Sequence, residues 1–405
     1  MGRPPSGGTL LAVARHSTTL LAAAGVATAG VLPVFLTGAL AVQVREELNF
    51  DEAGQGLTVA AFFGTAALSS AAAGRLAERL GPAAAMRVSS GLAALSLLAV
   101  AVAARSLPLL LACLVIGGLG NAMAQPATNL FLARRVPPSQ LGLAFGVKQS
   151  AIPLATLLGG LAVPAIALTV GWRWAYVLGA VGAAALLVVD PGGSTTAPPT
   201  ERGARRGEHD TALRPLVLLA VGVGLGAAAA GTLGSFLVSG AVAEGMSEGT
   251  AGLLASACSA AGVAMRLWVG ALADRRGGRH LPVVAGMMAS GALGFGLLAL
   301  GSTGGLVSGA LLSYILGWSW PGLFNLAIVR SNPGAPGAAT GITQTGTYIG
   351  AVMGPLLFGA VVEGSGYPAA WLVSGVAAMI GAIGIVLGRR ALVADRIRRE
   401  ALAPL

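Results

Sequence analysis

Long apolar runs recur along the whole chain, and each is long enough to cross a lipid bilayer. A membrane-spanning helix needs about 20 consecutive, mostly apolar residues. Twelve windows meet this requirement, near residues 17–42, 53–73, 83–104, 107–133, 141–168, 171–189, 215–243, 251–273, 281–300, 304–329, 337–362 and 367–388. The sequence therefore predicts an all-α membrane protein with twelve transmembrane helices.

Composition supports this class of protein. Hydrophobic residues make up 55% of the 405 residues and charged residues only 10%, whereas a soluble domain carries about 25% charged residues. The net charge of +10 does not indicate nucleic-acid binding, because the arginines lie in short loops and at the termini rather than on a basic face with aromatic residues. The expected partners are the lipid bilayer and a small-molecule substrate, with no nucleic acid.

No pattern typical of an enzyme or a metal site is present. Cys113 and Cys258 each lie inside an apolar run, where a thiol is more often a small core residue than half of a disulfide. No cluster of His, Cys and acidic residues has metal-ligand spacing, and no nucleophile–base pair or phosphate-binding loop is found. We therefore expect no catalysis and no cofactor. A membrane enzyme or sensor with the same helices is the alternative, and nothing in the polar segments favours it.

The arginines predict an orientation. If both termini are cytoplasmic, the inner segments hold 20 arginines and the outer loops only three, which are Arg45, Arg105 and Arg173. Positive residues favour the cytoplasmic side. The first apolar run lacks a convincing cleavage site, so we interpret it as a first transmembrane helix rather than a signal peptide. The composition, rich in Ala, Gly and Arg, suggests a bacterial source with a high-GC genome, and hence a multi-pass protein of the bacterial inner membrane.

The chain contains an internal repeat of about half its length. At an offset of 195 residues, Pro126 matches Pro321, Arg135 matches Arg330, Pro138 matches Pro333, Gly142 matches Gly337, Gly146 matches Gly341 and Gln149 matches Gln344. At an offset of 196, Glu52 matches Glu248 and Gly56 matches Gly252. We predict a six-helix bundle over residues 1–190, a polar cytoplasmic linker over 191–214 and a second, pseudo-symmetric six-helix bundle over 215–405.

Each half also carries one short charged loop. The later copy begins at Gly270 and continues through Asp274 and Arg275, and the earlier copy runs from Gly74 through Glu78 and Arg79. The later copy resembles the signature loop of the major facilitator superfamily, which joins the second and third helices of each half. The earlier copy departs from that pattern, with Glu78 in place of aspartate and no basic cluster after it. For the earlier copy alone, an ordinary basic cytoplasmic loop is the alternative interpretation.

This resemblance covers essentially the whole chain and implies a mechanism. Members of the superfamily are secondary transporters that work by alternating access, with the substrate held between the two halves near the membrane midplane. The resemblance assigns gating roles to Gly74, Glu78, Arg79, Gly270, Asp274 and Arg275. The protein is expected to act as a monomer, with a coupled proton or an exchanged anion.

Lys148, the only lysine of the chain, lies about two turns inside the predicted fifth helix. A cation at membrane depth costs about 2.5–3.5 kcal/mol, so we expect it to face a cavity or a partner, with Gln149 beside it. The segment from Gly142 to Ser150 resembles the fifth helix of the cyanate and nitrate/nitrite porter-like branch, which implies a positive group presented to a small anion. A lysine that snorkels to the interface is the alternative.

Arg266 is the second cation expected inside a span. It either lines the cavity or pairs with Asp274, two turns further along the same helix, in a seam at the cytoplasmic side. We favour the pairing with Asp274, and therefore a gating role for Arg266.

Polar and aromatic residues on the fourth and tenth helices are further substrate-binding candidates. Asn121, Gln125 and Asn129 are spaced four residues apart and so share one helix face. The tenth helix carries Tyr314, Trp318 and Asn325, with Pro321 to bend it. Such amides also join helices, at about 0.6 kcal/mol each, and the aromatic rings also fill core space, so a purely structural role is the alternative.

The fifth and eleventh helices both begin with glycines four residues apart, a spacing that allows close helix contact and sliding. Gln149 and Gln344 follow these glycines, and Tyr348 lies one turn beyond Gln344. We predict that Gln344 and Tyr348 contact the substrate, or that the two glutamines contact each other.

The predicted spans contain no carboxylate near their centres. Exporters of cationic drugs usually need one, so the sequence favours an anionic or neutral substrate. The main hypothesis is a secondary transporter of a small organic or inorganic anion. The alternative is an exporter of neutral or amphipathic compounds, with Phe35, Tyr314, Trp318 and Trp320 as an aromatic pocket.

Overall fold

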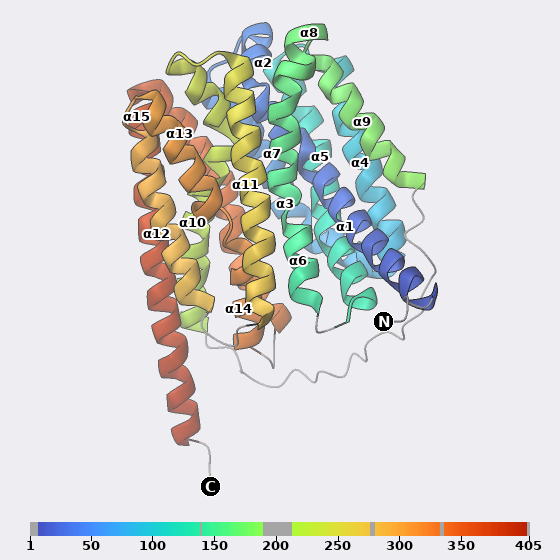
Figure 1. Ribbon diagram of the computed structural model, residues 1–405, viewed down its shortest axis with the longest axis vertical. Coiled ribbons are helices and arrows are strands. Elements are labelled where there is room, and N and C mark those ends of the chain that lie inside the picture. The colour runs from blue at the N-terminus through green and yellow to red at the C-terminus, as the bar shows by residue number, and fades with distance from the viewer. Residues whose placement is uncertain (1–6, 138–139, 189–212, 276–279, 333–335, 403–405) are drawn as a thin grey trace, which may run out of the picture.

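The computed structural model describes residues 7–137, 140–188, 213–275, 280–332 and 336–402. Every regular element within these ranges is a helix, and the helices form one bundle (Figure 1). This confirms the expected all-α class.

The first half of the chain contributes the helices that carry Lys148 and its neighbours. They are α1 (Gly7–Ala39), α2 (Ala41–Leu48), α3 (Glu52–Leu80), α4 (Pro82–Ala103), α5 (Leu107–Arg135), α6 (Leu141–Gln149), α7 (Ala151–Ala162), a π-helical turn (Val163–Ala167), α8 (Leu168–Val170) and α9 (Trp172–Val188). The window predicted as one helix over 141–168 is therefore interrupted twice, at Ser150 and at the π-helical turn.

The second half contributes the helix that carries Arg266. Its elements are α10 (Leu213–Ala243), α11 (Glu248–Arg275), α12 (His280–Leu298), α13 (Thr303–Leu312), a π-helical turn (Ser313–Gly317), α14 (Pro321–Ser331) and α15 (Pro336–Leu402). α15 contains a sharp turn at Gly366, whose φ of 80° suits glycine because it has no Cβ. We call the residues before and after Gly366 the first and second arms of α15.

Ten of the described helical segments are long and apolar enough to cross a membrane, and α9 is a shorter apolar helix. Two of the ten, Leu143–Val170 and Thr303–Ser331, run through several of the elements named above. One of the ten extends from Ala339 to Asp395 and includes both arms of α15. The expected count of twelve spans stays a prediction. Residues 189–212, which contain most of the predicted linker, lie outside the described residues, and α10 begins at Leu213.

Local signals explain several helix ends. The side chain of Asp51 accepts a 2.7 Å hydrogen bond from the amide of Gly54 and so caps α3. Gly81, with a φ of 79°, ends α3, and Pro82 begins α4, where the missing amide hydrogen costs nothing. α3 and α4 are therefore separated by a single residue.

The two ends of the bundle are distinguishable. α1 begins and α15 ends towards the lower end in Figure 1, which we call the terminal end. α2 and α8 lie at the opposite end, which we call the distal end (Figure 1).

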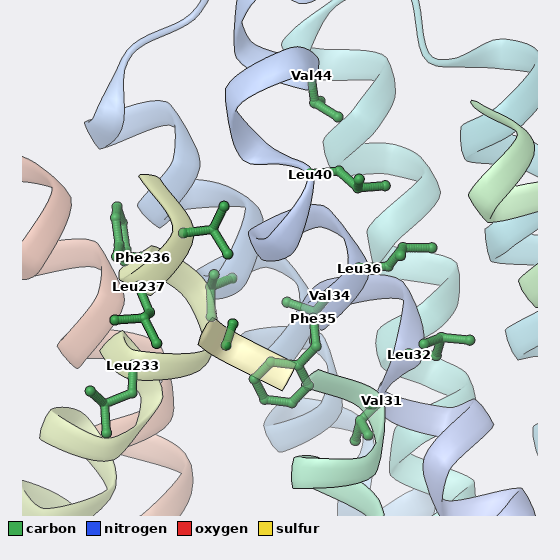
Figure 2. Packing of buried hydrophobic residues seen from close by; sticks show 14 of the residues in the cluster. Val31, Leu32, Val34, Phe35, Leu36, Leu40, Val44, Leu233, Phe236 and Leu237 are labelled. Atoms are coloured by element: carbon green, nitrogen blue, oxygen red, sulfur yellow. The ribbon is translucent and has the colours of Figure 1, made fainter. Parts of the chain in front are cut away.

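One large hydrophobic cluster includes residues of both halves. It contains Phe35 of α1 together with Leu233, Phe236 and Leu237 of α10. Figure 2 shows these α1 and α10 side chains within the same packed region. The halves are thus joined by an apolar core, and the polar residues of interest lie among these helices.

Candidate functional site

Lys148 is buried near the end of α6, with 4% of its surface exposed. Its ammonium group donates hydrogen bonds to Gln125 Oε1 at 2.7 Å and to Asn129 Oδ1 at 2.8 Å. Both amides belong to α5. Two of the three amides that were predicted to share one face of this helix therefore contact Lys148. A lysine ammonium has three hydrogens, and one is left for a further acceptor.

Asn121, the third of these amides, does not contact Lys148. Its side chain packs against α1, where Asn121 Oδ1 lies 3.9 Å from the position that a Cβ on Gly30 would take. Asn121 Oδ1 is buried without a hydrogen-bond partner. The spacing predicted one shared helix face for the three amides, but only Gln125 and Asn129 contact Lys148.

The helix break after α6 creates the acceptor for Arg266. Residue 153 is proline and has no amide hydrogen, so it cannot donate to the carbonyl of Gln149 as it would in a regular helix. Arg266 Nη1 of α11 donates to this carbonyl instead. Gln149 contributes its main-chain carbonyl to the contact with Arg266. Its side chain is half-buried.

A second helix break lies opposite, between α13 and α14. Pro321 leaves the carbonyl of Gly317 without its helical donor, and the indole N–H of Trp320 donates to it at 2.8 Å. Within the same break, the carbonyl of Trp318 accepts a hydrogen bond from Arg266 Nη2.

Arg266 is 5% exposed and connects a carbonyl from each half of the chain. Its Nε is buried without a partner. The favoured interpretation, a pairing with Asp274, falls on a side chain outside the described residues, as does the side chain of Arg275. Within the part of the chain that the structure describes, no carboxylate lies within ion-pair distance of Lys148 or Arg266.

An aromatic contact between the halves lies beside Arg266. The rings of Phe35 and Trp318 pack edge to face with centroids 5.9 Å apart, and Tyr314 packs on Trp318 at 5.2 Å. Gly234 makes room for them, because a Cβ there would come 2.6 Å from both rings. Trp320 is not part of this group, since its ring packs on Phe324 in a separate cluster.

The remaining predicted substrate-binding residues are more peripheral. Tyr348 of α15 packs against a cluster formed by the first half, which includes Phe131. Gln344 is exposed on α15, and Asn325 is partly exposed on α14. The structure brings neither of these two amides to Lys148.

The predicted gating residues lie at the terminal end. Glu78 and Arg79 are exposed in the last turn of α3, and a Cβ on Gly74 would meet no atom within 4 Å. Gly270 lies inside α11 and is partly exposed. Gly74 therefore makes no tight contact across the halves in this conformation.

Close glycine contacts between the halves lie towards the distal end. A Cβ on Gly56 would come 2.6 Å from the carbonyl oxygen of Pro355, and a Cβ on Gly252 would come 2.6 Å from that of Gly160. The two contacts are related by the repeat, since residues 56 and 252 match at 196 and residues 160 and 355 at 195. The match of Gly56 with Gly252 is visible in the sequence and was the available signal for this interface, which was not predicted.

Polar contacts accompany these glycines. The side-chain amide of Gln55 donates to the carbonyl of Ser235, and Ser239 donates to Gln55 Oε1 at 3.3 Å. The amide of Gln43 donates to the carboxylate of Glu248. Each contact joins the first half to the second.

Outside the candidate spans, α2 is held to α9 by an ion pair. Arg173 Nη2 lies 2.7 Å from Glu47 Oε1, and the indole of Trp172 donates to Glu47 Oε2 at 2.6 Å. The hydrogen bond from Arg173 holds the pKa of Glu47 below its ordinary value.

Solved structures share this fold. The chain is similar to the crystal structure of a D-xylose–proton symporter, with a TM-score of 0.70 and 16% sequence identity over 91% of this chain and 97% of that one. It is similar to a bacterial homologue of the human lysosomal transporter Spinster, solved in an inward-facing and occupied conformation, with a TM-score of 0.69 and 17% identity over 94% and 98% of the two chains. At these identities the likeness shows the fold.

Curated proteins and a family model give the relationship. The chain is 30% identical over 321 residues to an uncharacterised MFS-type transporter of Mycobacterium tuberculosis, present in strains CDC 1551 and H37Rv, with 75% of this chain and 69% of that protein covered. The family model of the Major Facilitator Superfamily matches residues 17–237 and again 219–404, so each half of the chain matches it separately. Nothing in these matches points to the cyanate and nitrate/nitrite porter-like branch. The chain belongs to the Major Facilitator Superfamily of transporters.

Proposed function

We propose that this protein is a secondary transporter that moves a small organic or inorganic anion by alternating access. The observation that carries the proposal is Lys148, a buried cation held by two neutral amides with no carboxylate in ion-pair distance among the described residues. In this proposal twelve spans form two six-helix halves, and the protein lies in the bacterial inner membrane with both termini in the cytoplasm.

The energetics of Lys148 favour an anionic ligand. A cation at membrane depth costs about 2.5–3.5 kcal/mol, and amide oxygens offset that cost only in part because they carry no net charge. An anion adjacent to Lys148 would take the remaining hydrogen and neutralise the charge in a medium where charge-assisted hydrogen bonds are strong. Gln125 and Asn129 keep the ammonium in place when no substrate is bound.

The contacts between the halves support the alternating-access part of the proposal. The matched glycine contacts at Gly56 and Gly252 close the distal end, while a Cβ on Gly74 at the terminal end would meet no atom within 4 Å. We infer that the terminal end opens first from this conformation. Arg266 then has to leave the carbonyl of Gln149, which is the only one of its two acceptors in the other half.

Coupling follows from the charges present. One structural neighbour is described as a proton symporter, but in this chain no described carboxylate contacts Lys148. We therefore propose exchange of anions, or symport in which the substrate itself carries the proton.

A second candidate function is export of neutral or amphipathic compounds. The observation in its favour is the aromatic group of Phe35, Tyr314 and Trp318, which lies between the halves next to Arg266. Those rings pack on one another in this conformation, so a ligand would have to separate them. This function does not require the charge of Lys148.

The test is a thermal-shift screen of purified protein against inorganic anions, small carboxylates, sugars and neutral amphipathic drugs. A ligand at 100 times its dissociation constant adds about 2.7 kcal/mol of stability. We expect anions to stabilise the wild type and Lys148→Arg, but not Lys148→Met, which keeps the chain length and loses the charge. Arg87→Ala, which removes an exposed arginine, is the matched control and should respond like the wild type. Equal stabilisation of Lys148→Met by anions, or stabilisation by neutral drugs alone, would overturn the anion proposal.

A further inference from the structure

A cavity of about 610 Å³ lies outside the region of Lys148 and Arg266, on the flank formed by α10 and α15. Its back wall is made of small residues, because α10 and the first arm of α15 pack backbone to backbone at Gly224, Gly350 and Gly354. Its rim consists of exposed apolar side chains, among them Val221 at 57%. Because these exposed apolar side chains lie on α10 and α15, which both belong to the membrane-spanning set, the rim is expected to face lipid in a bilayer.

The hydroxyl groups of the lining already donate their hydrogens within the protein. Of its three hydroxyl residues, Thr232 donates to the carbonyl of Ala229 at 2.7 Å, and Thr345 donates to that of Gly341 at 3.0 Å. Ser374 lies 3.5 Å from Thr232, oxygen to oxygen. All other lining side chains are apolar. A ligand that fills this cavity must therefore be a hydrocarbon where it touches the wall.

The length of the cavity suits an extended chain. Its lining extends along α10 from Val217 to Thr232, which at 1.5 Å per residue is about 22 Å. The hydrocarbon depth of one leaflet is about 15 Å, so an acyl chain that enters from one leaflet can lie within the groove over its whole length.

A cation stands at the terminal end of this groove. Arg214 lies three residues before Val217 and seven before Val221, so the three share one face of α10. Its side chain is exposed. An acyl chain lying in the groove from the terminal-end leaflet would bring its headgroup to this guanidinium.

We propose that the groove between α10 and α15 is a phospholipid site, which takes one acyl chain along its apolar wall and an anionic headgroup at Arg214. The site is separate from the proposed transport pathway, since none of its lining residues contacts Lys148 or Arg266. The result of the lipid experiment therefore does not depend on whether the substrate is an anion.

Native mass spectrometry of protein purified from vesicles of phosphatidylglycerol and phosphatidylcholine tests the apolar part. The wild type is expected to retain one phosphatidylglycerol per chain. Val221→Trp, which places an indole over the groove, should retain at least about tenfold less, since two methylene groups left unburied already cost that much affinity. Thr345→Trp fills the groove from the opposite wall and should behave alike. Val181→Trp replaces an equally exposed valine of α9, at 62%, and should retain lipid like the wild type.

The headgroup part has its own comparison. Arg214→Ala should lose about fivefold in preference for phosphatidylglycerol over phosphatidylcholine, the effect of one basic residue at an anionic surface, whereas Arg87→Ala should not. Free glycerol phosphate should give no thermal shift, because it lacks the acyl chain. Retention by Val221→Trp and Thr345→Trp equal to that of Val181→Trp would overturn the proposal. An unchanged preference in Arg214→Ala, or an equal shift with glycerol phosphate, would overturn the assignment of the headgroup.

Discussion

Gly56 and Gly252 provide the sharpest test of which end of the transporter is closed. A methyl group at either position would lie 2.6 Å from a backbone carbonyl oxygen of the other half, that of Pro355 or Gly160. Backbone cannot rotate away as a flexible side chain can, so the halves must separate at the distal end. Overpacking of this kind costs about 1–3 kcal/mol, and such a difference shifts a two-state equilibrium by about 5–150-fold.

The assay is the reaction of a thiol placed behind the closed end. Ser235 is 1% exposed, and its hydroxyl has no partner, so Ser235→Cys costs little and is unreactive while the distal end is closed. The native Cys113 and Cys258 are buried and give a low background. When opening is fast relative to labelling, the rate of maleimide labelling follows the open population.

We expect Gly56→Ala and Gly252→Ala to raise the labelling rate of the Ser235→Cys protein by about 5–150-fold each. Gly182→Ala and Gly286→Ala are matched controls in helices α9 and α12, because a Cβ there meets no atom within 4 Å. They carry the same gain in helix propensity, about 1 kcal/mol, without the clash. Labelling as slow in Gly56→Ala and Gly252→Ala as in these controls would refute the assignment of a closed distal end.

Three further predictions concern individual contacts. Trp320→Phe removes the donor to the Gly317 carbonyl and should lower the free energy of unfolding by about 1–3 kcal/mol. The control, measured in the same detergent, is Trp268→Phe, which replaces an exposed indole. Equal stability of the two variants would contradict the prediction. Arg266→Met leaves the carbonyls of Gln149 and Trp318 without their donor and should lower the free energy of unfolding by about 1.5–3 kcal/mol. Arg266→Lys should restore part of this loss. No loss of stability in the methionine variant would show that these hydrogen bonds do not hold the helices together. The pKa of Glu47 is lowered in the folded protein. The contribution of Glu47 to the free energy of unfolding is therefore fully present above the pKa of an unfolded glutamate, and it disappears as pH falls through the folded pKa. The stability difference between wild type and Glu47→Gln should shrink on acidification, and a difference that grows would have the wrong sign.

Sequence patterns predicted the helices well because membrane spans need long apolar runs, and these runs contain few charged residues. They predicted the helix interruptions less well. Pro321 indicated a bend in the tenth predicted helix, and the structure has a break there, but the break at Ser150 within the fifth was not expected. The position of a helix break depends on local backbone geometry, which apolar composition does not predict.

The candidate site was predictable where side chains interact with side chains. The single lysine and the amides at Gln125 and Asn129 were identified from burial cost and helical spacing, and they meet in the structure. The partners of Arg266 were not identifiable in this way because they are backbone carbonyls. Every residue has a carbonyl, and prolines within helices, Pro153 and Pro321 among them, mark where a carbonyl lacks its helical donor.

Lys148 also allows the most direct measurement of the central claim. As the only lysine of the chain, it gives one side-chain signal in protein labelled with ¹⁵N-lysine. The signal is expected to shift saturably when a stabilising anion is added, with the same dissociation constant as the thermal shift, and to stay unchanged with neutral ligands. An anion that stabilises the protein and leaves the Lys148 signal where it was would contradict the role of Lys148 as the charge partner of the substrate.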